Sequence, residues 1–136
     1  MNTVTIDPQE VEFWLAYTEG WEKAAGFIVT IQGIKFSFRV SGLLMPKLLI
    51  SELSSGTKVW EFRLTIEDAL LRGATKEGLL EVFEEYAEAI SKELDPILKE
   101  KITTQSAIRK REREAEFGNM PEIVPFDMDK WMEESQ

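Results

Sequence analysis

The chain has 136 residues, of which 43% are hydrophobic and 10% aromatic, and it carries a formal net charge of −9 at pH 7. This length and composition are typical of one globular domain with a hydrophobic core. The absence of cysteine and histidine excludes disulfides, thiolate chemistry, zinc sites and Ser-His or Cys-His catalysis within one chain. Carboxylate-based and lysine-based catalysis remain compatible with the composition. Because no catalytic, metal-binding or cofactor-binding motif is present, we expect a non-enzymatic protein without a metal or cofactor.

The N-terminal residues do not combine a basic region with an apolar stretch, so they do not resemble a signal peptide. No apolar run approaches the length of a membrane span. We therefore expect a cytoplasmic protein that does not interact with membranes.

Residues 7–25 carry two competing patterns. Asp7, Pro8 and Glu10 form a typical helix start, and apolar residues then recur at helical spacing as far as Gly26. The alternative is a strand, because apolar residues also alternate at Val11, Phe13, Leu15 and Tyr17. We predict a helix, because its start signal has a defined capping mechanism.

Residues 27–64 have the alternating pattern of strands. Gln32-Gly33 predicts a tight hairpin turn or a bulge, and a second hairpin is predicted around residues 54–57. A polar face with Lys35 and Arg39 indicates an antiparallel sheet with one side in water. The sequence thus predicts an α+β fold with an N-terminal helix, an antiparallel sheet of about four strands in two hairpins, and C-terminal helices.

Capping signals organise the helices that follow. Thr65 with Asp68 predicts a short helix that stops at Gly73, and Thr75 could cap the next helix. That helix has a clear apolar stripe, formed by Leu79, Phe83, Tyr86, Ile90, Leu94 and Ile97. Glutamates crowd its other side, and we interpret them as a solvated face: Glu81, Glu84, Glu85 and Glu88.

Asp95-Pro96 predicts either a kink or the start of a new helix that runs toward Phe117 and ends at Gly118-Asn119. Beyond Ile108 this helix is charged all round, so we expect its end to project from the domain. The charged end contains a dense basic cluster, Arg109, Lys110, Arg111 and Arg113, interleaved with glutamates. We divide the chain into a single domain over residues 1–118 and a C-terminal arm over residues 119–136.

The arm is acidic but rich in apolar side chains. Pro121 and Pro125 favour an extended entry, and Asp127 could cap one helical turn. A purely solvating tail would not carry these apolar residues, so we predict that they bind a surface of the same domain, of a twin subunit or of a partner. The predicted contact residues are Ile123, Val124, Phe126, Met128, Trp131 and Met132.

Basic side chains on the sheet and on the charged helix end could contact nucleic-acid phosphates. These candidates are Lys35, Arg39, Lys47, Lys58, Arg63, Arg109, Arg111 and Arg113. Phe36 and Phe38 alternate with the cations, which places these rings on the opposite face and argues against base stacking there.

The sequence is most compatible with a small accessory protein that works by protein–protein contact or assembly, and homo-oligomerisation through the helix or exchanged arms is a natural corollary. The alternative is a single-stranded nucleic-acid-binding protein with a basic sheet face and an acidic regulatory tail. A further alternative is an acidic protein that mimics nucleic acid and inhibits a basic partner.

Overall fold

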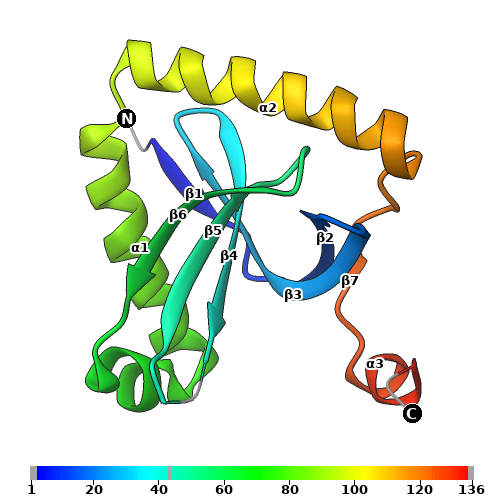
Figure 1. Cartoon of the computed structure of the whole chain (residues 1–136). Coiled ribbons are helices and arrows are strands. Elements are labelled where there is room, and N and C mark those ends of the chain that lie inside the picture. The colour runs from blue at the N-terminus through cyan, green and yellow to red at the C-terminus, as the bar shows by residue number, and fades with distance from the viewer. Residues whose placement is uncertain (1–2, 43, 135–136) are drawn as a thin grey trace.

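The computed structural model describes residues 3–42 and 44–134, and it has an α+β fold in which helices accompany one seven-stranded antiparallel sheet. In Figure 1, α1 flanks the sheet, α2 crosses above the ends of the hairpins, and the chain then descends past β2 to α3. The α+β prediction is confirmed. Leu43 and the last two residues of the arm lie outside the described residues.

The strands follow one another along the sheet in the order β6-β5-β4-β3-β2-β7, and β1 pairs with β3. Their bounds are β1 (Val4–Ile6), β2 (Val11–Tyr17), β3 (Gly20–Ile31), β4 (Ile34–Ser41), β5 (Lys47–Glu52), β6 (Thr57–Arg63) and β7 (Val124–Pro125). The helices are α1 (Lys76–Glu93), α2 (Pro96–Phe117) and α3 (Met128–Glu134), preceded by two short helical turns, η1 (Glu67–Leu71) and η2 (Arg72–Ala74).

The predicted N-terminal helix is wrong, because residues 11–31 form the hairpin of β2 and β3. The alternating pattern outweighs the helix-start signal, since it buries Val11, Phe13 and Leu15 against the rest of the fold. The Asp7 side chain still accepts a backbone hydrogen bond, from Gln9 at 2.9 Å. It therefore stabilises a turn rather than a helix, as aspartate commonly does.

The prediction of about four strands is also wrong, because β1, β2 and β7 enlarge the sheet to seven strands. The two predicted hairpins themselves are present. Gln32 (φ 49°) and Gly33 (φ 85°) form the tight turn between β3 and β4, with the two positive φ angles that such turns favour. Residues 47–52 and 57–63 form the second hairpin.

β3 is long enough to serve two halves of the sheet. Residues 27–31 pair with β4, whereas residues 20–26 pair with β2. The change occurs at Gly26, where an added Cβ would lie 2.4 Å from the carbonyl oxygen of Phe38. Glycine therefore allows the strands to approach closely where the sheet bends.

The main core lies between α1 and one face of the sheet. Phe83 of α1 packs edge-on against Phe27 and Phe38, with ring centroids 5.9 Å and 5.5 Å apart, and all three side chains are buried. The aromatic residues of β3 and β4 therefore point toward α1. This leaves the opposite face of β4, β5 and β6 to polar side chains.

A second, smaller core lies on that opposite face, because the curved sheet brings β2 over it. Phe13 and Leu15 pack there with Ala24 and Leu53. The turn between β5 and β6 seals this core: Gly56 accepts a backbone hydrogen bond from Ala16 at 3.0 Å.

Most helix signals in residues 65–118 are confirmed, but the short helix predicted to stop at Gly73 is instead the two turns η1 and η2, which run to Ala74, and Ile97 of the predicted stripe is exposed. Thr75 accepts a hydrogen bond from Gly78 at the start of α1, and Asp95 accepts one from Leu98 at the start of α2. The chain breaks between these helices, and α2 ends at Gly118. An ion pair between Arg72 and Glu85 ties the preceding turns to α1; the hydrogen bond from Arg72 lowers the pKa of Glu85.

Candidate functional site

The arm lies in cis along the free edge of β2. β7 pairs antiparallel with β2, with Glu12 opposite Val124 and Val11 opposite Pro125. The backbone N–H of Phe126 continues this contact by donating to the Glu10 carbonyl oxygen at 2.8 Å. Because Pro125 has no N–H, this pairing is short. We name the strand edge that it covers the β2 edge, residues 10–14.

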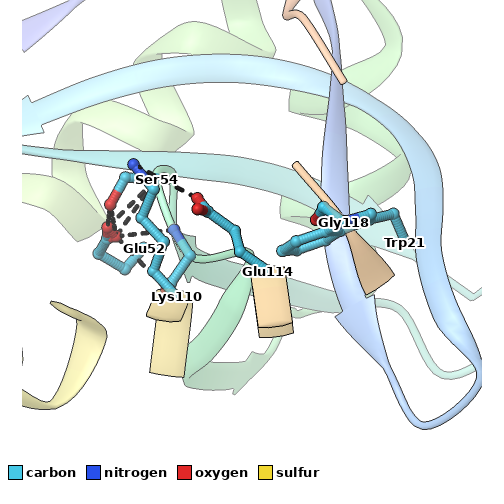
Figure 2. Close-up of polar contacts among 7 residues, drawn as sticks. Trp21, Glu52, Ser54, Lys110, Glu114 and Gly118 are labelled. Atoms are coloured by element: carbon cyan, nitrogen blue, oxygen red, sulfur yellow. Dashed lines mark hydrogen bonds and ion pairs between the residues drawn. The ribbon is translucent and has the colours of Figure 1, made fainter. Parts of the chain in front are cut away.

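Two tryptophans of the β2–β3 hairpin hold the chain that leads into β7. Trp21 Nε1 donates to the Gly118 carbonyl oxygen at 3.1 Å (Figure 2). The Trp21 ring also packs edge-on against Phe117. Trp14 Nε1 donates to the Glu122 carbonyl oxygen at 3.3 Å. Both contacts use backbone acceptors, so they position the arm without depending on its side chains.

The predicted arm residues divide into two groups. Val124 pairs with β2, while Phe126 packs against Trp131 with ring centroids 5.4 Å apart. The ring of Trp131 also lies 4.9 Å from the ammonium of Lys23 on β3, a cation–π distance. The other three predicted residues remain exposed: Ile123, Met128 and Met132.

Asp127 caps α3, as predicted, by accepting hydrogen bonds from the backbone of Asp129 and Lys130. The capped segment runs over seven residues, longer than the single turn predicted. This helix presents Trp131 to the domain and leaves Met128 (59% exposed) and Met132 (55% exposed) at the surface. Docking in cis thus uses only part of the apolar surface of the arm.

A buried carboxylate lies beside the docked arm. Glu12 is 5% exposed, and its Oε1 atom has no hydrogen-bond partner among the described residues. Opposite residues in antiparallel strands project to the same face, so Glu12 shares a face with Ala25 on β3 and Val124 on β7. The arm therefore closes one side of this carboxylate with an apolar side chain.

Glu10, whose carbonyl oxygen receives the Phe126 amide, is partly buried. Burial raises the pKa of its carboxyl group, and the charge of Lys76 partly opposes that shift. A raised carboxyl pKa means that folding favours the protonated form, so this group's contribution to stability falls as the pH rises through its titration range.

The structure brings most of the predicted basic sheet residues to one face. The register places Arg39 beside Leu49, and Lys47 beside Arg63. Arg39 and Lys58 both line a hollow of about 320 Å³, which Tyr17 of β2 also borders. Lys35 lies on the same strand as Arg39 but lines a different hollow.

Glu61 partly neutralises this basic face. It forms ion pairs with Lys58 at 3.3 Å and Lys47 at 3.5 Å. The hydrogen bond from Lys58 and the charges of both lysines lower the pKa of the Glu61 carboxyl group. Tyr17, 44% exposed, is the aromatic ring that borders the hollow, whereas Phe36 and Phe38 are buried on the other side of the sheet. The face can thus contact phosphates but offers little surface for base stacking.

Of the basic cluster of α2, Lys110 lines the same hollow as Lys35 of the sheet. Arg109 and Arg111 are exposed. Arg113 forms an ion pair with Glu116 at 3.4 Å and lies over the ring of Phe117. Its charge is therefore engaged within α2.

α2 also covers a hollow of about 370 Å³ between the hairpin ends and the arm, lined by Lys35, Glu52, Leu53, Ser54, Lys110, Glu114, Met120 and Ile123. The buried Glu52 carboxylate accepts hydrogen bonds from the backbone N–H and the hydroxyl of Ser54 (Figure 2). It also accepts one from the backbone N–H of Ser55. These contacts close the turn between β5 and β6, which gives Glu52 a structural role.

The sequence prediction missed the residues that receive the arm: Glu12, Trp14, Trp21 and Lys23. They were assigned to a helix, on which they would not form one continuous face. The signal that could have identified them is the alternation of Val11, Phe13 and Leu15, which places Glu12 and Trp14 together on the other side of a strand.

Within residues 3–42 and 44–134, no cluster of three or more acidic side chains could hold a metal ion. None of the helices in that described part is long and apolar enough to cross a membrane. Comparisons of the chain with protein-family models, with curated proteins and with solved structures found no match.

Proposed function

We propose that this protein is a non-enzymatic accessory factor that acts by protein contact, and that its C-terminal arm is a releasable cover over the β2 edge. The observation that carries the proposal is the limited docking of the arm. A two-residue strand, the cation–π contact of Trp131 with Lys23 and a few hydrogen bonds to the arm backbone hold it in place. Elements with so few contacts open at lower free energy than a core.

Release of the arm would provide two binding surfaces. The β2 edge would offer unpaired backbone groups, which readily accept an added strand. The arm would offer Phe126 and Trp131 together with the already exposed Met128 and Met132. Either surface could engage a twin subunit or another protein.

A disulfide lock tests this proposal. Val11 and Pro125 lie opposite one another, at a separation of about 4.5–5.5 Å between Cα atoms for such pairs, within disulfide range. The chain has no native cysteine, so Val11→Cys with Pro125→Cys creates one unique bond. We expect the reduced variant to self-associate or to retain proteins from its native cell, and the oxidised variant to lose both properties. The single variants control for each substitution.

The lock also distinguishes docking from arm exchange. Oxidation at high protein concentration would yield covalent dimers on a non-reducing gel if arms exchange between twins. Equal binding by the oxidised and reduced forms would contradict a releasable cover.

The alternative, nucleic-acid binding, is favoured by the basic face around the 320 Å³ hollow, where Arg39 and Lys58 converge. If this face binds single strands, Arg39→Ala with Lys58→Ala should weaken binding of a labelled oligonucleotide at low salt by about tenfold or more, because two phosphate contacts are lost. Arg109→Ala with Arg111→Ala removes two exposed charges of α2 instead and shows whether the loss is specific to the sheet face. Fluorescence anisotropy that shows no binding at micromolar protein would remove this alternative.

A further inference from the structure

Glu12 is an unusual residue to bury beneath a stable contact. Its Oε1 atom is buried without a hydrogen-bond partner, and no described residue forms an ion pair with its carboxylate. Buried polar groups in folded proteins are nearly always paired, because an unpaired buried carboxylate is strongly unfavourable. The docked arm therefore leaves the Glu12 carboxylate of the β2 edge without the hydrogen-bond or ion-pair partner that a buried carboxylate needs.

The strand register indicates which position could supply a partner for Glu12. Val124 lies directly opposite Glu12, and side chains at such positions have Cβ atoms about 4.5–5.5 Å apart. A lysine or arginine in place of Val124 could therefore reach the Glu12 carboxylate and form a cross-strand ion pair. Valine can only exclude water from it.

The acidic charge around the β2 edge also favours a basic partner. The first 22 residues, which include the β2 edge, carry five acidic and no basic side chains: Asp7, Glu10, Glu12, Glu19 and Glu22. The arm itself has five acidic side chains and one basic side chain, a net charge of −4. Apart from the contact of Trp131 with Lys23, like charges thus oppose docking in cis, and the arm of a second copy would bring the same charge and the same valine. A basic segment would be attracted.

We propose that the β2 edge is a strand-addition site for an extended basic segment of another protein, which displaces the arm and places a lysine or arginine opposite Glu12. This inference rests on the proposed release of the arm. Trp14 is positioned to anchor the incoming chain through a backbone carbonyl oxygen, as it now anchors the arm through Glu122. The added strand would supply main-chain hydrogen bonds, and the pair with Glu12 would supply specificity.

The first part of the test is made within the intact chain. Val124→Lys should lower the equilibrium constant for arm opening by about tenfold, a modest effect for a partly buried ion pair. Hydrogen exchange of the Phe126 amide, which donates to Glu10, measures that constant. Val124→Lys should no longer lower the equilibrium constant for arm opening when Glu12 is replaced by glutamine. Ile123→Lys adds the same charge at the adjacent position, which lines the hollow with Glu52 and Glu114, so any gain there should persist in the Glu12→Gln background.

The second part uses two synthetic peptides that copy residues 119–134, one with valine and one with lysine at the position of Val124. Fluorescence anisotropy with the full-length protein should show at least tenfold tighter binding of the lysine peptide, and Glu12→Gln should abolish the difference. Equal binding of both peptides, or no effect of Val124→Lys within the chain, would overturn the basic partner and leave arm release standing. Binding by neither peptide, together with exchange of the Phe126 amide only on global unfolding, would instead refute arm release and the proposed function.

Discussion

Replacing Gly56 with alanine should lower the free energy of unfolding by about 2–4 kcal/mol, the sum of strain at positive φ and of overpacking. Gly56 has a φ of +69°, and an added Cβ would lie 2.7 Å from the Trp14 carbonyl oxygen and 2.9 Å from the Ala16 nitrogen. These are rigid backbone atoms, so the turn between β5 and β6 would have to withdraw from β2. Loss of that contact would open the second core at Phe13 and Leu15.

Gly33→Ala is the matched control for Gly56→Ala. Gly33 also has a positive φ, +85°, but an added Cβ there would meet no atom within 4 Å. Gly33→Ala should therefore lower the free energy of unfolding only through backbone strain, by about 1–2 kcal/mol. Chemical denaturation of both variants measures the difference. Equal losses would mean that the β5–β6 turn does not support β2, and hence that the surface beneath the arm is organised differently.

The second large effect is expected for Trp131→Ala, which removes the main side-chain anchor of the arm. The variant loses the cation–π contact with Lys23, worth about 0.5–2 kcal/mol, whereas the ring contact with Phe126 lies within the arm. The equilibrium constant for arm opening should therefore rise about twofold to thirtyfold, while global stability changes much less. Met132→Ala alters an exposed residue of the same helix and should leave arm opening unchanged.

Hydrogen exchange of the Phe126 amide reports the opening in both variants. If Trp131→Ala destabilises the whole protein as much as it opens the arm, the arm is part of the cooperative core and cannot act as a cover.

Local signals in the sequence were sufficient for much of the fold. Thr75, Asp95 and Gly118 act at helix ends through hydrogen bonds within a few residues, and Gln32-Gly33 forms its turn through local backbone angles. Such features depend on neighbours along the chain, so a sequence pattern is enough to identify them.

The β2 strand was missed because its decisive contacts are distant in sequence. Asp7 and Pro8 gave a valid local helix signal, but Phe13 gains more by packing with Leu53 in the second core. β7 has only two residues and contains Pro125, so it is too short for its sequence to show the alternating pattern that predicts a strand. The same distance explains why the sequence identified the apolar residues of the arm but not the surface that they contact.

For the basic residues of the sheet, the sequence predicted the face on which they lie but not their neighbours. Their alternation along β4, β5 and β6 correctly placed Arg39 and Lys47 on a polar face, since register follows from strand pairing. Sequence alone did not reveal that Glu61 pairs with two of the lysines or that Tyr17 borders the same hollow. Both facts depend on the curvature that brings β2 over the sheet.

Native-state hydrogen exchange of the unmodified protein tests the central claim, release of the arm, most directly. The Phe126 amide should exchange through a local opening that depends little on denaturant, at a free energy several kcal/mol below that of the amides of β4 and β5. Exchange of Phe126 only with global unfolding, at the same free energy and with the same denaturant dependence as those strands, would contradict the proposed function.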